Sequence, residues 1–409
     1  MDSITILGIL LATLSSVLIA HCIHRYHSKS RRDRRIEYHR QIADFSFLYP
    51  TTLEERLGLR SKPNVRLVTA FNINNSFTTS DRGVHQEFLK KAKDAIHLVH
   101  NTEDWIKLGN VTRKTLGFCL SHFNDGLPYI PLAPFVRVVS FNVVLHVLFK
   151  IEPSKVDLGE ARKATDAINR LWIESKKPHS VPSLYDKKLL NNALEKLFPS
   201  GSLSDDGHSP LDLIMPAYET LWRVVLLTFV SIASQNADPV TEEELQEAVQ
   251  NVPQCFCRKS RVEMRALAIA KEGLRLYPPT KRIYRATSTI DGESGVIAAD
   301  VSACHRDRRV WGTNALKFKP RRFHNWPREN KRLSYFPFGV GRHICPAAAE
   351  YGDKIIVLLV VELTRRFGTR QTGLKVHFGD SEVQQRVSTP LPSGRDDMEN
   401  WVLELEEET

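Results

Sequence analysis

A glycine-rich loop that ends in a cysteine and leads into a long apolar segment constrains this chain more than any other feature. The loop runs from Phe336 to Pro346, with the sequence Phe-Pro-Phe-Gly-Val-Gly-Arg-His-Ile-Cys-Pro. Pro346 suits the first position of a helix, where its missing N–H costs nothing. A sulfur at the positive end of that helix is favoured as a thiolate. Gly339 and Gly341 would let the backbone curl closely around it. The pattern predicts a buried Cys345 thiolate at a loop-to-helix junction.

The surroundings of this cysteine restrict its chemistry. No CxxC or HxxxH pattern accompanies Cys345, so it cannot build a zinc site. A single thiolate does suffice as the axial ligand of a haem iron. The plainer alternative is a structural cysteine that comes after a glycine-rich loop.

The loop resembles the haem-binding signature of the cytochrome P-450 superfamily, F-x-x-G-x-[RH]-x-C-x-[GA]. The specified positions are occupied by Phe338, Gly341, His343, Cys345 and Ala347. The resemblance implies a haem b cofactor with Cys345 on the iron and with Phe338, Gly339 and Gly341 shaping the loop.

The same resemblance assigns partners to the haem propionates. It places His343 and Arg285 beside them. His85 and Lys90 or Lys91 are weaker candidates, because the family's W-x-x-x-R spacing is not kept. The resemblance also implies O2 as co-substrate and electrons from NADPH, delivered by an NADPH-cytochrome reductase.

A second motif lies in an apolar segment, 211–234, that is expected to be helical. Pro216 interrupts the segment, and Glu219 and Thr220 come soon after it. A mid-helix threonine usually bonds the carbonyl four residues earlier, whereas an unpaired buried carboxylate is costly. Ala217 to Thr220 resembles the family's [AG]-x-[DE]-T motif. The resemblance makes Thr220 and Glu219 the catalytic pair, with a hydrogen bond to dioxygen from Thr220 and proton relay by Glu219.

A third motif is a charged pair one helical turn apart. Glu272 and Arg275 are spaced i, i+3, which alone would indicate only a surface ion pair. The pair resembles the family's E-x-x-R, and Phe318–Phe323 resembles F-x-P-x-R-F. The resemblance therefore predicts a buried network of Glu272, Arg275 and Arg322 with a structural role.

The amino-terminal segment has the pattern of a membrane anchor. Residues 4–20 carry no charge, and a basic block comes directly after them. The length is at the short end for a membrane span, and the basic block favours a cytosolic position for the rest of the chain. The competing interpretation is a cleaved signal peptide. We expect a transmembrane anchor at 1–24, a basic linker at 25–60 and a haem-thiolate domain at 61–409, held at the endoplasmic reticulum membrane by a single pass with its catalytic part in the cytosol.

Composition and periodicity indicate one large, mainly α domain with small β-sheets, and the resemblance implies the cytochrome P-450 fold. The 409 residues are 42% apolar, and a net charge of +10 includes 47 acidic residues, so nucleic-acid binding is not expected. Six scattered cysteines suit a reducing compartment. Helical spacing is found at about 85–100, 135–150, 158–176 and 184–197, a loop at 199–210, and strands at 281–302 and 370–404.

Two departures qualify the resemblance. The stretch before Thr220 is shorter than is usual in the family, and the opening sheet and first helix are hard to find in 36–80. The segments 218–223 and 390–397 resemble fungal members. The sequence thus predicts a membrane-anchored monooxygenase of a lipophilic small molecule in fungal secondary metabolism. The alternatives are a haem-thiolate isomerase or dehydratase, and an inactive, shortened paralogue that acts as a membrane-bound interaction protein.

Overall fold

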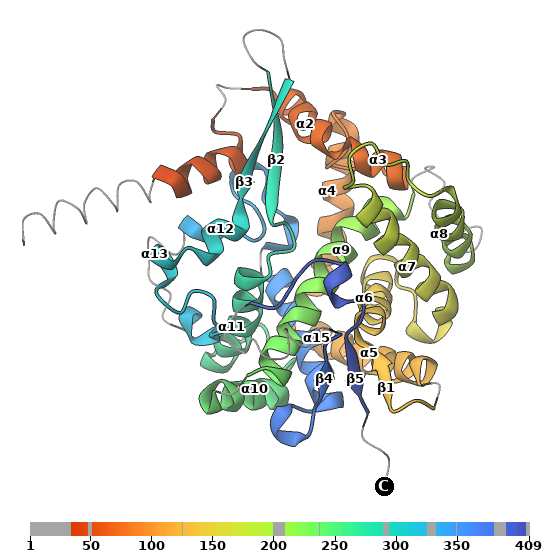
Figure 1. The fold of residues 1–409 in the computed structure, drawn as a ribbon, viewed down its shortest axis with the longest axis vertical. Coiled ribbons are helices and arrows are strands. Elements are labelled where there is room, and N and C mark those ends of the chain that lie inside the picture. The colour runs from red at the N-terminus through yellow and green to blue at the C-terminus, as the bar shows by residue number, and fades with distance from the viewer. Residues whose placement is uncertain are drawn as a thin grey trace, which may run out of the picture.

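The computed structural model describes residues 34–47, 51–124, 126–198, 209–236, 238–288, 294–324, 333–348, 350–379 and 390–405 (Figure 1). The predicted anchor at 1–24 lies outside the described residues.

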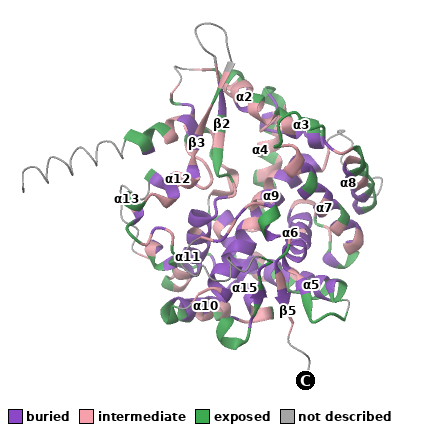
Figure 2. Ribbon diagram, viewed as in Figure 1, coloured by how far each residue is buried: buried purple, intermediate pink, exposed green. Residues whose placement is uncertain are grey.

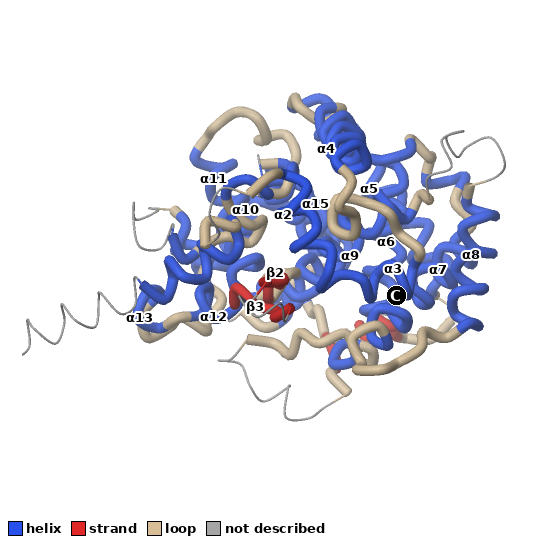
Figure 3. The backbone as a smooth tube through the Cα atoms, turned by 90° about the horizontal axis from the view of Figure 1, so that it is seen from above, coloured by secondary structure: helices blue, strands red, loops and turns tan. Residues whose placement is uncertain are grey.

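Helices build most of the described chain, as expected for the predicted fold class (Figure 3). Residues 34–44 are helical, in a region where the sequence predicts no element. The longer helices after it are α2 Leu53–Ser61, α3 Val65–Phe71, α4 Arg82–His97, α5 Thr102–Phe123, α6 Leu132–Phe149, α7 Leu158–Glu174, α8 Leu184–Leu197, α9 Leu211–Phe229, α10 Pro239–Asn251, α11 Arg261–Leu276 and α15 Tyr351–Phe367. Two short helices, α12 Val301–Arg306 and α13 Arg308–Trp311, come between α11 and α15 in the sequence.

Two small antiparallel sheets complete the described fold. The larger pairs β2 Arg282–Ser288 with β3 Ser294–Asp300, within the predicted strand region 281–302. The smaller has the order β1-β5-β4 and joins β1 Tyr129–Pro131, β5 Val402–Glu404 and β4 Val376–His377. Little of the described part of the predicted strand region 370–404 is therefore strand.

The core forms where α6, α9, α11 and α15 pack together, and burial is concentrated around them (Figure 2). Within the described residues, two helices are long and apolar enough to cross a membrane, Leu132–Phe149 and Leu211–Ser234. Most residues of both are buried inside the protein, so their apolar character is accounted for by the core. The predicted helix over 211–234 is observed as α9 followed by one π-helical turn, Val230–Ser234.

The segment before α2 packs against the body of the protein. Ile42 and Ala43 are buried in a small cluster with Ala299 on β3. The carboxylate of Asp44 accepts a hydrogen bond of 2.8 Å from the backbone N–H of Arg342, at the cysteine loop. Part of the predicted linker 25–60 thus contributes to the surroundings of Cys345.

Close packing between α9 and α11 requires a glycine at position 273. A Cβ atom there would lie 2.0 Å from the hydroxyl oxygen of Thr228, whereas a Cβ on Gly117 in α5 would meet nothing within 4 Å. We expect Gly273→Ala to lower the free energy of unfolding by about 1–3 kcal/mol through overpacking. The matched Gly117→Ala should be neutral or stabilising by up to about 1 kcal/mol. Urea unfolding of both variants measures the difference, and equal effects would contradict the packing argument.

Candidate functional site

The cysteine loop folds back on itself around the sulfur. The backbone N–H of Cys345 donates to the carbonyl of Phe338 at 2.9 Å, which closes the loop. Gly339 and Gly341 have φ values of +76° and +62°, conformations that favour glycine. The backbone N–H of Ala347 hydrogen-bonds the sulfur and favours its thiolate form by lowering the pKa. The loop therefore presents the sulfur with a backbone donor beside it.

The junction with the next helix differs from the prediction. Pro346 opens a three-residue 3-10 turn, Pro346–Ala348, and not the long helix. The helix α15 begins only at Tyr351, after Glu350 in a left-handed conformation. Because this turn separates the sulfur from α15, the helix dipole does not dominate, and burial raises the pKa of the Cys345 thiol. The nearby Arg60 guanidinium acts in the opposite direction and favours the thiolate.

Phe338 packs between the loop and α15. A Cβ atom on Gly352, in the first turn of α15, would lie 2.5 Å from the Cζ atom of the Phe338 ring. The ring thus fixes the distance between the loop and the helix.

A large cavity borders the sulfur. Its volume is about 1360 Å³, above the roughly 300–1,000 Å³ of a usual small-molecule site. The predicted residues that line it are Cys345, Phe338, Gly339, His343, Arg285, Glu219, Thr220 and the weaker candidate His85, whereas Gly341 does not line it. The structure therefore brings together residues from four distant parts of the sequence, with room for a large prosthetic group and a second molecule.

One part of the cavity lining is basic, and its members have no carboxylate partner among the described residues. These four side chains, called the propionate wall below, are Arg60, His85, Arg285 and His343. Arg60 donates to the hydroxyl of Ser76 at 3.1 Å, and that hydroxyl contacts Nδ1 of His85 at 2.7 Å. Arg285 donates to the carbonyls of Tyr284 and Ala43, while its buried Nε has no hydrogen-bond partner in the described chain. The same is true of the buried Nε2 of His343 within the described residues.

Burial and mutual repulsion disfavour the charged forms of these groups. Burial lowers the pKa of Arg60 to about 10, and burial together with Arg60 lowers the pKa of Arg285 to about 9. Burial, Arg60 and Arg285 lower the pKa of His343 to about 3. In the described part of the chain, no carboxylate forms an ion pair with Arg60, Arg285 or His343.

This charge arrangement fits the predicted haem. Buried cations without a counter-ion are unfavourable, and the two propionates of a haem b would neutralise Arg60 and Arg285. The cysteine sulfur and the basic wall border the same cavity. Arg60, which the sequence analysis does not select, would join Arg285 and His343 as a propionate partner, and His85 supports it through Ser76. Lys90 and Lys91 do not line the cavity.

The acid–alcohol pair on α9 lies on the cavity wall but is already engaged. The Thr220 hydroxyl donates to the Pro216 carbonyl at 2.9 Å, the ordinary helical arrangement. Glu219 is buried and forms an ion pair with Arg395 near the carboxyl terminus. Its second oxygen, Oε1, has no hydrogen-bond partner in the described chain. The pair thus supplies one free carboxylate oxygen and one hydroxyl that must reorient to donate elsewhere.

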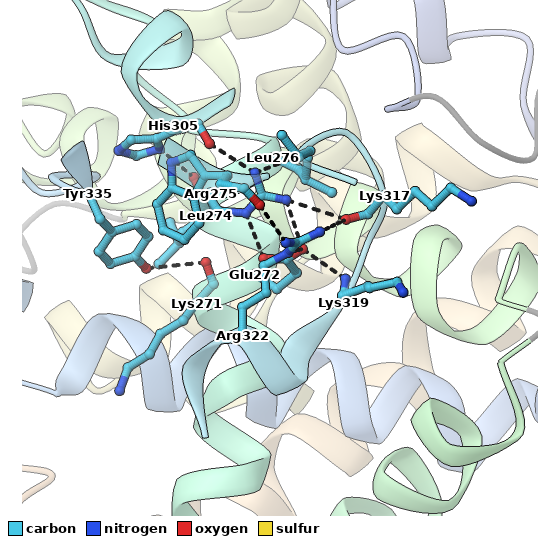
Figure 4. A network of polar contacts seen from close by, with 12 residues as sticks. Lys271, Glu272, Leu274, Arg275, Leu276, His305, Lys317, Lys319, Arg322 and Tyr335 are labelled. Atoms are coloured by element: carbon cyan, nitrogen blue, oxygen red, sulfur yellow. Dashed lines mark hydrogen bonds and ion pairs between the residues drawn. The ribbon is translucent and has the colours of Figure 1, made fainter. Parts of the chain in front are cut away.

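Figure 4 shows the charged network around Glu272, Arg275 and Arg322. None of these three residues lines the cavity. Glu272 and Arg275 are fully buried and joined by two hydrogen bonds, of 2.7 and 2.8 Å. Arg322 donates to the same carboxylate at 3.2 Å. Arg275 also donates to the carbonyls of His305 and Ala315, which links α11 to the segments after β3. The network ties several distant segments together at one point.

The fold and this site define a helical protein with a cysteine loop suited to ligate haem. Residues 211–347 match the cytochrome P-450 family model. A cytochrome P-450 from Thermus thermophilus, CYP175A1, superposes with a TM-score of 0.52 at 17% identity and covers 77% of this chain and 80% of its own. Another, CYP102L1, reaches a TM-score of 0.53 at 15% identity, with 87% and 91% covered. Residues 211–347 thus match the cytochrome P-450 family, and the fold of the chain is similar to that of solved cytochromes P-450.

Curated relatives match over a short region. Cytochrome P-450 CYP82D47 of Panax ginseng is 33% identical over 112 residues, which are 24% of this chain and 30% of the relative. Cytochrome P-450 71A16 of Arabidopsis thaliana is 27% identical over 147 residues, 32% of this chain and 29% of the relative. The chain thus spans about a third of the length of the curated relatives that it matches.

Proposed function

We propose that this chain is a haem-thiolate monooxygenase that oxidises a lipophilic small molecule. Haem, when bound, supplies the activation of dioxygen and the oxidation of the substrate. The observation that carries the proposal is the shared cavity, in which one loop cysteine borders a wall of buried cations without counter-ions among the described residues.

Each residue of the site has a distinct part in this proposal. The Cys345 sulfur binds the iron, and Arg60, Arg285 and His343 hold the propionates. Glu219 and Thr220 supply protons from the α9 side of the cavity, with Glu219 oriented by Arg395.

The finer assignments rest on the sequence and the family. We propose that electrons come from NADPH through a membrane-bound reductase, and that residues 1–24 anchor the protein in the endoplasmic reticulum membrane with the catalytic domain in the cytosol. The proposed catalytic domain begins earlier than residue 61, since residues 34–47 pack on β3 and on the cysteine loop. Fungal secondary metabolism is the proposed setting.

The reduced, carbon monoxide difference spectrum of the purified full chain tests thiolate ligation. We expect the red-shifted Soret band of a thiolate-bound haem, because the loop holds the Cys345 sulfur against the cavity. Cys345→Ala should abolish that band, and Cys304→Ala, a buried cysteine that does not line the cavity, should leave it unchanged. Well-folded wild-type protein without the band would favour the non-catalytic alternative. Turnover that needs neither O2 nor NADPH would favour an isomerase or dehydratase.

A further inference from the structure

A second group of basic side chains lines the same cavity, apart from the propionate wall. Arg66 comes from α3, Lys176 from just after α7, Arg223 from α9 and Lys281 from just before β2. We refer to these four residues as the distal basic cluster. Burial and the positive charges of Arg395, Arg223, Arg66 and Lys281 all lower the pKa of Lys176, so these side chains lie within electrostatic range of it.

Acids that would neutralise the distal basic cluster are absent from the described residues. No carboxylate in that part of the chain forms a hydrogen bond or an ion pair with any of the four members. The buried acid Glu219, on the same cavity wall, is engaged by Arg395. Burial and the four surrounding cations lower the pKa of Lys176 to about 8. Asp397 acts on Lys281 only as a weaker charge. Lys176 and Lys281 are exposed at the cavity edge, whereas Arg66 and Arg223 are half-buried, so the cluster offers cations that an anion in the cavity can reach.

Two arginines of the cluster are held in place by neutral groups. Arg66 donates to the Ser175 hydroxyl at 2.7 Å, and its guanidinium lies 5.0 Å from the centre of the Trp172 ring. Arg223 donates to the Pro279 carbonyl at 2.5 Å, while its buried Nε has no hydrogen-bond partner in the described chain. These contacts position the guanidinium groups without neutralising them, so donor capacity is left for a ligand.

The rest of the cavity wall is largely apolar. Side chains that line it include Leu67, Phe88, Ile96, Val143, Val147 and Ile355. A ligand that extends along this wall would bury hydrocarbon against it and place a polar end in the distal basic cluster.

We propose that the substrate is a lipophilic molecule with an anionic group, a carboxylate or a phosphate, which the distal basic cluster binds. The inference rests on the proposed function, because it assigns the propionate wall to haem and leaves this cluster to the substrate. The anion fixes one end of the molecule at the cluster, so the position of the anion along the substrate selects the carbon that lies on the Cys345 side of the cavity.

Calorimetric titration of the purified full chain tests the proposal with dodecanoate, dodecyl phosphate and dodecanol, which share one chain length. We expect at least one of the two anions to bind about tenfold or more tightly than dodecanol. All three ligands bury the same hydrocarbon chain, and only the anions also accept charge-assisted hydrogen bonds. The preferred anion identifies the group. Raising the salt concentration should weaken anion binding and leave dodecanol binding unchanged.

Substitutions test whether the distal basic cluster causes the preference for anions over dodecanol. The double variant Lys176→Gln with Lys281→Gln should remove most of the anion preference while keeping the affinity for dodecanol. Arg223→Gln should act in the same direction. The control Lys188→Gln on α8, which does not line the cavity, should change neither. Haem absorbance of the same samples reports the proposed function independently of these titrations.

Three results would overturn the proposal. One is equal affinity for the anions and dodecanol in the wild-type chain. Another is a preserved anion preference in the double lysine variant. The third is binding of the chain to anionic phosphatidylserine vesicles, lost in the double variant, without any preference for the soluble anions; the cluster would then contact a membrane surface and not a substrate.

Discussion

Arg275→Leu is expected to lower the free energy of unfolding by about 3–5 kcal/mol, because it leaves the fully buried carboxylate of Glu272 without its main partner. The substitution also removes two hydrogen bonds to carbonyls after β3, so these segments lose part of their connection to α11. Urea-induced unfolding followed by circular dichroism measures the change, and haem content of the purified variant reports its effect on the site.

A double variant distinguishes two causes of the destabilisation, the unpaired carboxylate of Glu272 and the lost packing of the Arg275 side chain. Glu272→Leu with Arg275→Leu removes both charges, and we expect it to be less destabilising than Arg275→Leu alone. Arg265→Leu, which breaks a partly exposed ion pair with Glu247, should have a far smaller effect. A loss in the Arg265 variant as large as in the Arg275 variant would contradict the importance of burial.

Local periodicity is enough to predict the helices with strong apolar patterns. The predicted segments 158–176 and 184–197 correspond to α7 Leu158–Glu174 and α8 Leu184–Leu197. The prediction misses β1 and gives only the region of β5, since both strands are three residues long and are stabilised by pairing between positions such as Tyr129 and Glu404. Such pairing depends on contacts across most of the chain, which no local pattern encodes.

The residues of the candidate site also fall into two groups, those that a local sequence motif predicts and those that it does not. Motif residues such as Cys345 and Glu272 can be selected because each motif is continuous in sequence. Arg60 and Lys176 cannot, because their importance arises from cations brought together from separate elements. A partial signal exists for Arg223 and Arg395, which lie in the segments 218–223 and 390–397 that resemble fungal members. The helix-dipole argument for Cys345 is wrong because the turn after Pro346 separates the sulfur from α15.

Arg60→Leu should have opposite effects on the haem-free and the haem-bound protein. In the haem-free chain Arg60 is a buried cation close enough to Arg285 to lower the pKa of that guanidinium, so its removal should be neutral or stabilising. In the haem-bound protein the same change would remove the proposed charge-assisted hydrogen bond from Arg60 to a propionate, worth about 2 kcal/mol. That loss corresponds to an affinity for haem that is about 30-fold weaker.

Transfer of haem to an excess of a haem-free globin measures the rate of haem dissociation. The change in Soret absorbance as the globin binds haem gives this rate. Arg60→Leu should transfer haem about 30-fold faster than the wild-type protein if the lost affinity is expressed in dissociation. Arg60→Lys keeps the charge but not the bidentate geometry and should fall between the two. Arg366→Leu, on the exposed end of α15 and away from the cavity, should match the wild-type rate. Unchanged transfer in Arg60→Leu would mean that the propionates lie elsewhere and that the basic wall has another anion as its partner.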